Sequence, residues 1–148
     1  MNLTPAQHQL AQVSLKDIMG SEGNSEKFTE RVSDLASRIW SEFIDEEIAH
    51  LLTEEQLDML GKLLEDEDTT EEDLSEFLNK CVPSFDEMYQ EKILDNKAAT
   101  VEGRVKQLRS LAAGESDKQQ LLDDCKSLIE KGEWLEVQAV LATDFAEY

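Results

Sequence analysis

Apolar residues recur at steps of three and four along most of this chain, the spacing that places them on one face of an α-helix. The longest such series is Phe28, Val32, Leu35, Ile39 and Phe43. It predicts a helix that begins at Glu26 and extends towards Leu51. No segment shows the sustained alternation of β-branched residues that is typical of a strand. We therefore expect an all-α fold with no sheet.

Short polar motifs predict where the helices begin. Thr4-Pro5-Ala6-Gln7 and Thr53-Glu54-Glu55-Gln56 have the pattern of capping boxes, in which a Thr and a Gln side chain satisfy each other's backbone amides. Thr69 or Thr70 is the expected cap of another helix, and Ser116 of a later one. Helical spacing in the first helix continues to Ile18, so this helix is expected to run to Gly20.

Glycine and proline predict where the helices end. Gly20, Gly114 and Gly132 suit the left-handed conformation that ends many helices, and Pro83 cannot continue one. These signals predict seven or eight short-to-medium helices in a compact bundle. Whether residues 85–113 form one helix or two stays open, because Gly103 weakens a single helix there.

The chain is 148 residues long, which fits one domain or one domain with an appended helical pair. We expect residues 1–113 to form an acidic helical domain, whose most acidic segment is 45–96. Residues 116–148 are then expected to form a C-terminal helical pair that packs on the same core.

Charge is spread unevenly along the chain. There are 34 Asp and Glu residues against 14 Lys and Arg, a formal charge of −20. Residues 45–96 hold eighteen acidic and three basic side chains, so most of the excess lies in about a third of the chain. This charge argues against direct binding of nucleic acid or of an anionic membrane, because both depend on Lys and Arg. The acids are either the ordinary solvent-exposed residues of polar helix faces or a surface for a basic partner.

The densest acidic stretch is the predicted partner-binding site. It comprises Glu65, Asp66, Glu67, Asp68, Glu71, Glu72 and Asp73. Charges are screened over about 8 Å at physiological salt, so neighbouring carboxylates act together and scattered ones do not. We expect this cluster to contact a basic protein surface, such as that of a nucleic-acid-binding protein.

The sequence predicts no catalytic, metal or cofactor site. In an EF-hand loop that starts at Asp66, Glu71 would replace the required glycine and Phe77 the bidentate acid. Glu47 and His50 have the Glu-x-x-His spacing of helical di-iron proteins, but those sites use the spacing twice and it occurs once here. Gly-rich phosphate loops and dinucleotide-binding motifs are absent from the sequence.

Cys81 and Cys125 lie on apolar helical faces outside any Cys-x-x-Cys pair. They predict free thiols in a reducing compartment, which makes the protein cytoplasmic by expectation. No apolar run approaches the roughly 20 residues of a membrane span. The basic patch formed by Arg104, Lys106 and Arg109 is expected to pair with acids of the same chain.

Residues 35–95 contain four segments in a recognisable order. They are Leu35-Ala36-Ser37-Arg38-Ile39, Leu51-Leu52-Thr53-Glu54-Glu55-Gln56-Leu57, Phe77-Leu78 and Val82-Pro83-Ser84-Phe85. This order resembles an uncharacterised short acidic helical domain of unknown function from uncultured bacteria. The resemblance implies no catalytic residues.

These features predict a non-catalytic, acidic helical protein with a binding or regulatory role, whose acidic middle engages a basic surface of a partner protein. A second interpretation is a nucleic-acid mimic, whose carboxylates imitate phosphates and inhibit a DNA- or RNA-binding protein. A third is a small helical enzyme with an unrecognised site. The sequence leaves the identity of the partner and the oligomeric state open.

Overall fold

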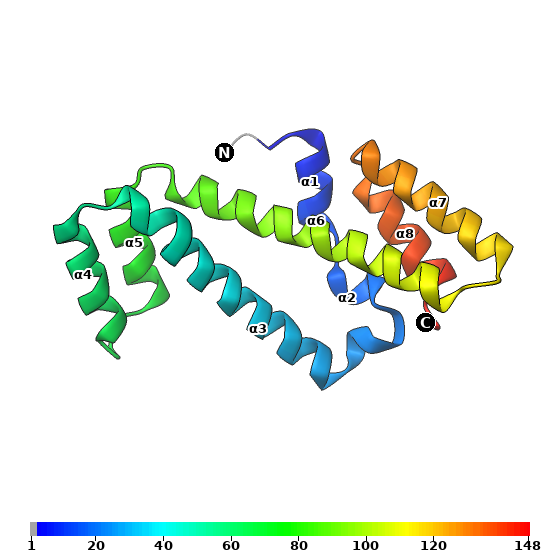
Figure 1. Cartoon of the computed structure of the whole chain (residues 1–148), viewed down its shortest axis with the longest axis horizontal. Helices are drawn as coiled ribbons and strands as arrows, with labels where there is room; N and C mark the ends of the chain where they lie inside the picture. The colour runs from blue at the N-terminus through cyan, green and yellow to red at the C-terminus, as the bar shows by residue number, and fades with distance from the viewer. Residues whose placement is uncertain (1–2) are drawn as a thin grey trace. The chain divides into compact units, whose positions relative to one another are not determined.

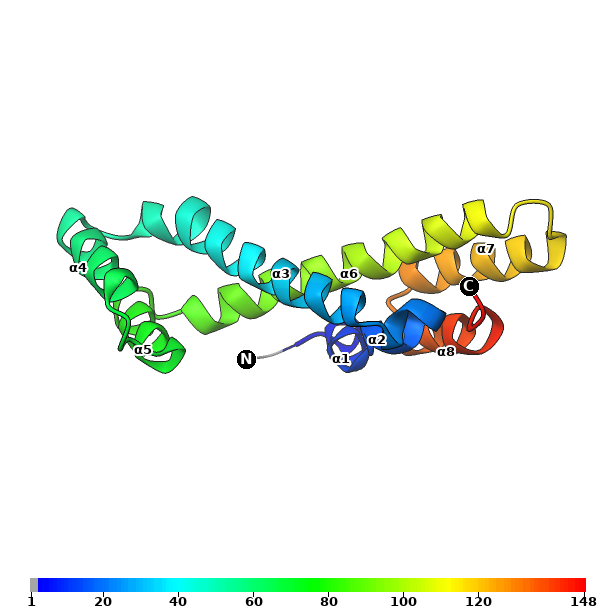
Figure 2. The same ribbon diagram turned by 90° about the horizontal axis from the view of Figure 1, so that it is seen from below.

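The computed structural model describes residues 3–148, and all regular structure in that range is helical (Figures 1 and 2). In chain order the elements are α1 (Pro5–Gln12), α2 (Leu15–Ile18), the 3₁₀ turn η1 (Gly20–Asn24), α3 (Glu26–Glu42), the π-helical turn η2 (Phe43–Ile48), the 3₁₀ turn η3 (Ala49–Leu51), α4 (Glu54–Glu65), α5 (Glu71–Cys81), α6 (Phe85–Leu111), α7 (Ser116–Glu130) and α8 (Trp134–Asp144). The described residues thus contain eight α-helices and no strand, which confirms the predicted all-α fold.

Capping boxes hold the starts of α1 and α4, as predicted. Thr4 Oγ1 accepts a hydrogen bond from Gln7 N at 3.1 Å, and Gln7 Oε1 accepts one from Thr4 N at 2.9 Å. Thr53 and Gln56 make the same reciprocal pair at the start of α4, at 3.2 and 2.9 Å. Each box satisfies two backbone amides that have no partner within the helix, so these starts are determined by local sequence.

The prediction of one continuous helix through residues 5–20 is wrong, because the helix breaks at Val13 and Ser14. Ser14 N donates to the Oε1 atom of Gln138 on α8 at 2.7 Å. Ser14 Oγ accepts from Asp17 N at 3.4 Å and caps α2. A contact with a residue 124 positions away therefore replaces a helical hydrogen bond at this break.

The predicted extension of the next helix towards Leu51 is confirmed as helical backbone, but the α-helix itself, α3, ends at Glu42 and continues as η2 and η3. In η2 the hydrogen bond from Ala49 N reaches back five residues to Ile44 O, which defines a wider π-helical turn. This turn buries Ile44 and Ile48 and leaves the acidic residues 45–47 exposed. The apolar series therefore continues into the core although the type of helix changes.

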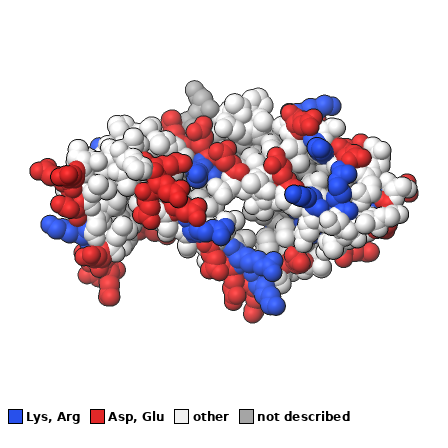
Figure 3. Space-filling model, viewed as in Figure 1, with Lys and Arg blue, Asp and Glu red and all other residues white. Residues whose placement is uncertain are grey.

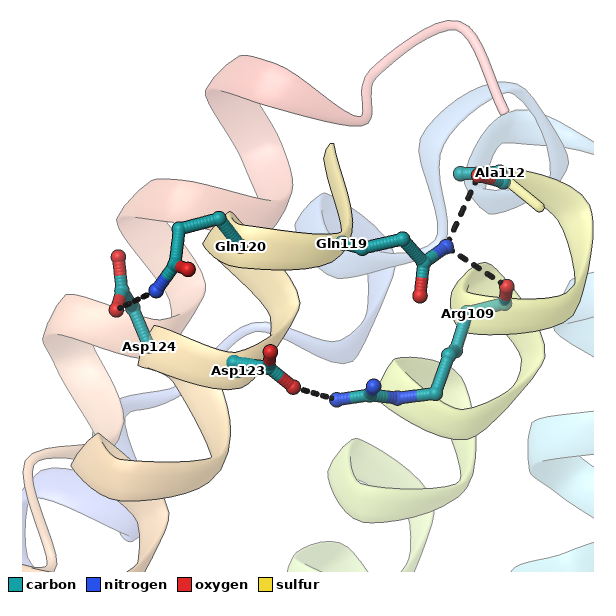
Figure 4. Close-up of polar contacts among 6 residues, drawn as sticks. All are labelled: Arg109, Ala112, Gln119, Gln120, Asp123 and Asp124. Carbon is teal, nitrogen blue, oxygen red and sulfur yellow. Dashed lines mark hydrogen bonds and ion pairs between the residues drawn. The ribbon is translucent and has the colours of Figure 1, made fainter. Parts of the chain in front are cut away.

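The question left open for residues 85–113 has a single answer, since α6 is one helix of 27 residues. Its end is joined to α7 by a polar contact that differs from the predicted cap. Ser116 does not cap α7; the N-cap position is Glu115, which makes no side-chain capping bond. Instead Gln119 Nε2 donates to Arg109 O and Ala112 O at 3.0 and 2.9 Å (Figure 4). A side chain in the first turn of α7 thus satisfies the last carbonyls of α6.

Residue contacts divide the chain into two compact units. Unit 2 is Asp34–Ile93, and unit 1 combines the residues up to Ser33 with Leu94–Tyr148. Unit 1 is therefore built from two separate stretches of sequence, and α3 and α6 each contribute residues to both units. The boundaries of the units fall after Ser33 and after Ile93, and α7 and α8 share the core of unit 1 with the N-terminal helices.

The core of unit 1 comes from α1, α2, α6, α7, α8 and the segments that join them. Its buried members are Leu10, Val13, Ile18, Leu94, Val101, Val105, Leu108, Ala112, Leu122, Cys125, Trp134, Val137, Leu141 and Phe145. Gly132, between α7 and α8, has a φ of +75°, and a Cβ atom there would lie 2.5 Å from Ala6 Cβ. Glycine at this position therefore serves both the left-handed turn and the close approach of α1.

Three cations of unit 1 donate to backbone carbonyls rather than to acids. Lys97 Nζ donates to Ala11 O at 3.0 Å, and Lys118 Nζ donates to Asp144 O at 2.6 Å. The third, Arg104, is 2% exposed, and its Nε donates to Ile18 O at 3.0 Å. These bonds fix α6 and α7 to the segments at the two ends of the described chain.

The core of unit 2 is smaller and aromatic at its centre. Its buried members are Phe43, Ile44, Ile48, Leu52, Leu60, Leu78, Val82 and Phe85. Half-buried Trp40 meets Tyr89 edge to face, with ring centroids 5.1 Å apart, and Phe85 at 5.9 Å. Edge-to-face pairs at these distances add to the stabilisation from burial alone. The aromatic rings thus join α3 to the start of α6 within unit 2.

Candidate binding surface

The structure brings the seven predicted acids together at one end of the α4–α5 pair. Glu65 is the last residue of α4, residues 66–68 lie in the turn, and residues 71–73 form the first turn of α5. All seven side chains are exposed. The two helices lie side by side, as both ribbon views show (Figures 1 and 2). Acids in the first turn of α5 also face the positive end of its helix dipole, which favours them there.

Two of these acids have local structural roles. Asp66 Oδ1 accepts a hydrogen bond from Asp68 N at 3.0 Å, which holds the turn. Asp73 Oδ2 accepts from Thr70 N while Thr70 Oγ1 accepts from Asp73 N, both at 3.1 Å. Of the two threonines considered as caps, Thr70 is therefore the one that caps α5. Both acids orient the turn as well as adding charge to it.

A groove of about 600 Å³ runs between α4 and α5. It is lined by Met59, Lys62, Leu63, Asp66, Asp68, Thr69, Asp73, Glu76, Phe77 and Lys80. Three of the predicted acids, Asp66, Asp68 and Asp73, line this groove. The other four, Glu65, Glu67, Glu71 and Glu72, lie outside its lining. The predicted cluster is therefore divided between a concave surface and the rest of the turn.

The apolar part of the groove was not predicted. On α4 only Leu60 is buried, whereas Met59 is 53% exposed and Leu64 is 54% exposed. Met59 lies on the groove side with Leu63, and Phe77 faces it from α5. The signal in the sequence is that apolar residues cover more of α4 than the single stripe a half-buried helix needs.

Unit 2 carries nineteen acidic and four basic side chains, a net charge of −15, and all nineteen acids are exposed. Figure 3 shows acidic side chains in several separate groups on the face in view, one of them at the end of the α4–α5 pair. Among the described residues of this unit, one ion pair lies within 4 Å, from Lys92 Nζ to Glu47 Oε1 at 3.1 Å. Glu47, considered above with His50, is thus engaged with a lysine.

The charge of Glu71 acts on the aromatic core of the same unit. Burial raises the pKa of the Tyr89 hydroxyl above its usual value, and the nearby negative charge of Glu71 raises that pKa further. Tyr89 stacks on Phe85, with ring centroids 6.1 Å apart and nearly parallel planes. The acidic turn and the aromatic core are therefore close enough to interact electrostatically.

The predicted basic patch on α6 separates into different roles. Arg109 pairs with Asp123 of α7, as expected for an intramolecular partner of an acid (Figure 4). Arg104 does not pair with an acid: it is buried, and its Nη1 donates to Gln107 Oε1 at 2.9 Å. Burial lowers the pKa of its guanidinium, and the charge of Glu22 partly opposes that shift.

A second groove, of about 370 Å³, lies between α6 and α7 in unit 1. Its lining comprises Glu102, Val105, Lys106, Arg109, Lys126, Ile129 and Glu130. It is lined by two acidic and three basic side chains, whereas the α4–α5 groove has four acidic and two basic ones. Arg109, its one arginine, is already bound to Asp123.

Both cysteines are free; Cys125 is buried, whereas Cys81 is only half-buried. Burial raises the pKa of the Cys125 thiol to about 11, with smaller contributions from Asp124 and Asp144. Between residues 3 and 148, no group of three or more His, Cys, Asp and Glu side chains could hold a metal ion. In the same range, no helix has both the length and the apolar character that crossing a membrane requires.

Comparison with known proteins gives no relative. No family model, no curated protein and no solved structure matches this chain. The resemblance of residues 35–95 to an acidic helical domain therefore stays a prediction.

Proposed function

We propose that this chain is a non-catalytic binding or regulatory protein, and that unit 2 engages a basic surface of a partner protein. The observation that carries the proposal is the exposure of every acidic side chain in unit 2, nineteen in 60 residues. One of them, Glu47, forms an ion pair within the described residues of this unit. The remaining charge faces solvent.

The concentration of charge is more than solubility requires. A net charge of magnitude 2–8 is about enough to keep a small domain soluble, whereas unit 2 alone carries −15. Such charge costs stability through self-repulsion. The same charge speeds encounter with a cationic partner and disfavours anionic ones. This advantage requires a basic partner.

The test is capture of partners from a lysate of the source organism at low salt, followed by identification of the proteins that high salt releases. Association of a released protein is then measured with two variants that each lose four charges. The first replaces Asp66 and Asp68 by Asn and Glu67 and Glu71 by Gln; Asn at 66 keeps the oxygen that accepts the hydrogen bond from Asp68 N.

The matched control variant replaces four exposed acids of unit 1 by Gln: Glu102, Glu130, Glu136 and Glu147. Both variants therefore have the same net charge. We expect the unit 2 variant to associate more slowly and with a weaker dependence on salt, while the control stays near the wild type. A unit 2 variant that associates at the wild-type rate in low salt would contradict the proposal.

The nucleic-acid mimic is a narrower form of the same proposal. If the released partner binds DNA or RNA, a duplex should compete with this chain for it. Lack of competition would place the contact elsewhere on the partner and exclude mimicry for that partner.

A further inference from the structure

The α4–α5 groove is chemically polarised along its length. Its three turn-end carboxylates are those of Asp66 and Asp68 in the turn and of Asp73 in the first turn of α5. Two helical turns before Asp66 stands Met59, and Phe77 stands one turn after Asp73. The acidic turn end and the apolar side chains therefore occupy successive parts of one groove.

The apolar part is open to solvent. Met59 is 53% exposed, and the other apolar side chains that line the groove, Leu63 and Phe77, are half-buried. A volume of about 600 Å³ accommodates several side chains of a binding partner. The groove lies between two helices, where the ridge of a third helix fits well.

We propose that this groove binds an amphipathic helix of the partner protein, one that is rich in Lys and Arg and carries an apolar ridge. This inference rests on the proposed function and specifies its contact. The apolar ridge packs on Met59 and Phe77, and the basic side chains face the turn-end carboxylates. Lys80, which lines the groove two turns beyond Asp73, repels a cationic segment placed in the opposite direction, so charge favours one orientation.

Charge complementarity favours this occupant over the alternatives. Four carboxylates line the groove against two lysines, which disfavours an anionic ligand. A second copy of unit 2 would bring another −15 to the same surface, so self-association through it is opposed by repulsion.

The test uses the full chain and a synthetic helix-forming peptide with Lys and Arg on one face and Leu on the other. Two variants each remove two charges from the same hairpin. The groove variant is Asp68→Asn with Glu76→Gln, and its control is Glu67→Gln with Glu72→Gln, whose side chains lie outside the lining. We expect the groove variant to weaken peptide binding about tenfold and the control by less than about threefold, because contact pairs count for more than the general field.

A second pair of variants tests the apolar contact. Met59→Gln and Leu64→Gln change residues of nearly equal exposure on the same helix, 53% and 54%, but only Met59 lines the groove. We expect Met59→Gln to weaken binding of the amphipathic peptide about fivefold, as loss of a partly buried apolar contact implies. It should leave unchanged the weaker binding of a peptide in which Gln replaces every Leu. Circular dichroism checks that each variant keeps its helices.

The results separate the two proposals. Equal losses in the groove and control charge variants overturn the groove assignment and leave the acidic surface as the proposed binding site. Equal losses for Met59→Gln and Leu64→Gln overturn the apolar contact, and with it the helix-in-groove inference. If no protein captured from the lysate is released by salt, the proposed function itself fails, whatever the peptide does.

Discussion

The two units of this chain use charge in opposite ways. Unit 1 has 88 residues with ten basic and fifteen acidic side chains, and three of its cations bind backbone carbonyls. Unit 2 has 60 residues with four basic and nineteen acidic side chains, and every acid is exposed. Three cations of unit 1 thus hold its own backbone together, whereas all nineteen acids of unit 2 are exposed.

The two units also differ in the size of their hydrophobic cores. Fourteen buried residues form the described core of unit 1, and eight form that of unit 2. Stabilisation from burial scales with the apolar area removed from water, so unit 2 has less of it to set against its self-repulsion. The unit with the larger net charge thus has the smaller core, roughly in proportion to its shorter length.

The largest expected effect comes from removing a buried ring in each unit. Phe145→Ala in unit 1 and Phe43→Ala in unit 2 remove side chains of 0% exposure and should each lower the free energy of unfolding by about 3–5 kcal/mol. Hydrogen exchange should show the loss of protection mainly in the unit that carries the change. Equal loss of protection in both units after either substitution would mean that they unfold as one.

A pair of glycines gives the next effect within unit 1. Gly132→Ala adds a Cβ atom 2.5 Å from Ala6 Cβ at a positive φ, and should cost about 2–4 kcal/mol. Gly114 has a φ of +88° with open space around it, so Gly114→Ala should cost only the backbone term of about 1–2 kcal/mol. Urea denaturation of both variants measures the difference. Equal midpoints would show that α1 moves away from the added Cβ atom without loss of stability.

Raising the pH should destabilise unit 1 through Cys125. The unfolded thiol ionises near its usual pKa of 9.0, whereas the folded thiol has its pKa raised to about 11. Stability from this group is thus fully present below pH 9.0 and is lost as the pH rises to about 11, by up to about 1.4 kcal/mol per pH unit. Cys125→Ala should flatten this slope in denaturation curves, and an unchanged slope would assign it to other groups.

Salt should produce the smallest effect, and only in unit 2. Screening weakens repulsion among its exposed acids, so added sodium chloride should raise the stability of unit 2 by less than about 1 kcal/mol. Hydrogen exchange read separately over residues 34–93 and 94–148 measures the change. Equal slowing in both ranges would indicate a general effect of salt rather than relief of repulsion.

Local signals predicted the parts of the fold that local chemistry determines. Thr4 and Thr53 cap helices as their sequences indicate, because a capping box is complete within four residues. The break at Ser14 was missed, since its hydrogen-bond partner is Gln138 on α8. The role of Arg104 was missed for the same reason: its acceptor, Ile18 O, is a backbone atom 86 positions away.

The candidate site divides in the same way. The acids from Glu65 to Asp73 are contiguous in sequence, so their gathering at one turn could be predicted. The sequence could not predict which of these acids line a groove, because that depends on how α5 packs beside α4. Met59, Leu63 and Phe77, the residues that give the groove an apolar side, come together only through that packing.

The discontinuity of unit 1 has a consequence for the order of events during synthesis. Residues 34–93 leave the ribosome as a complete set, so unit 2 can form its core while translation continues. Val13 and Ile18 must wait for Leu141 and Phe145, which are made more than 120 residues later. The nascent chain therefore presents its acidic unit first, and it holds an unfinished N-terminal segment until the last helix arrives.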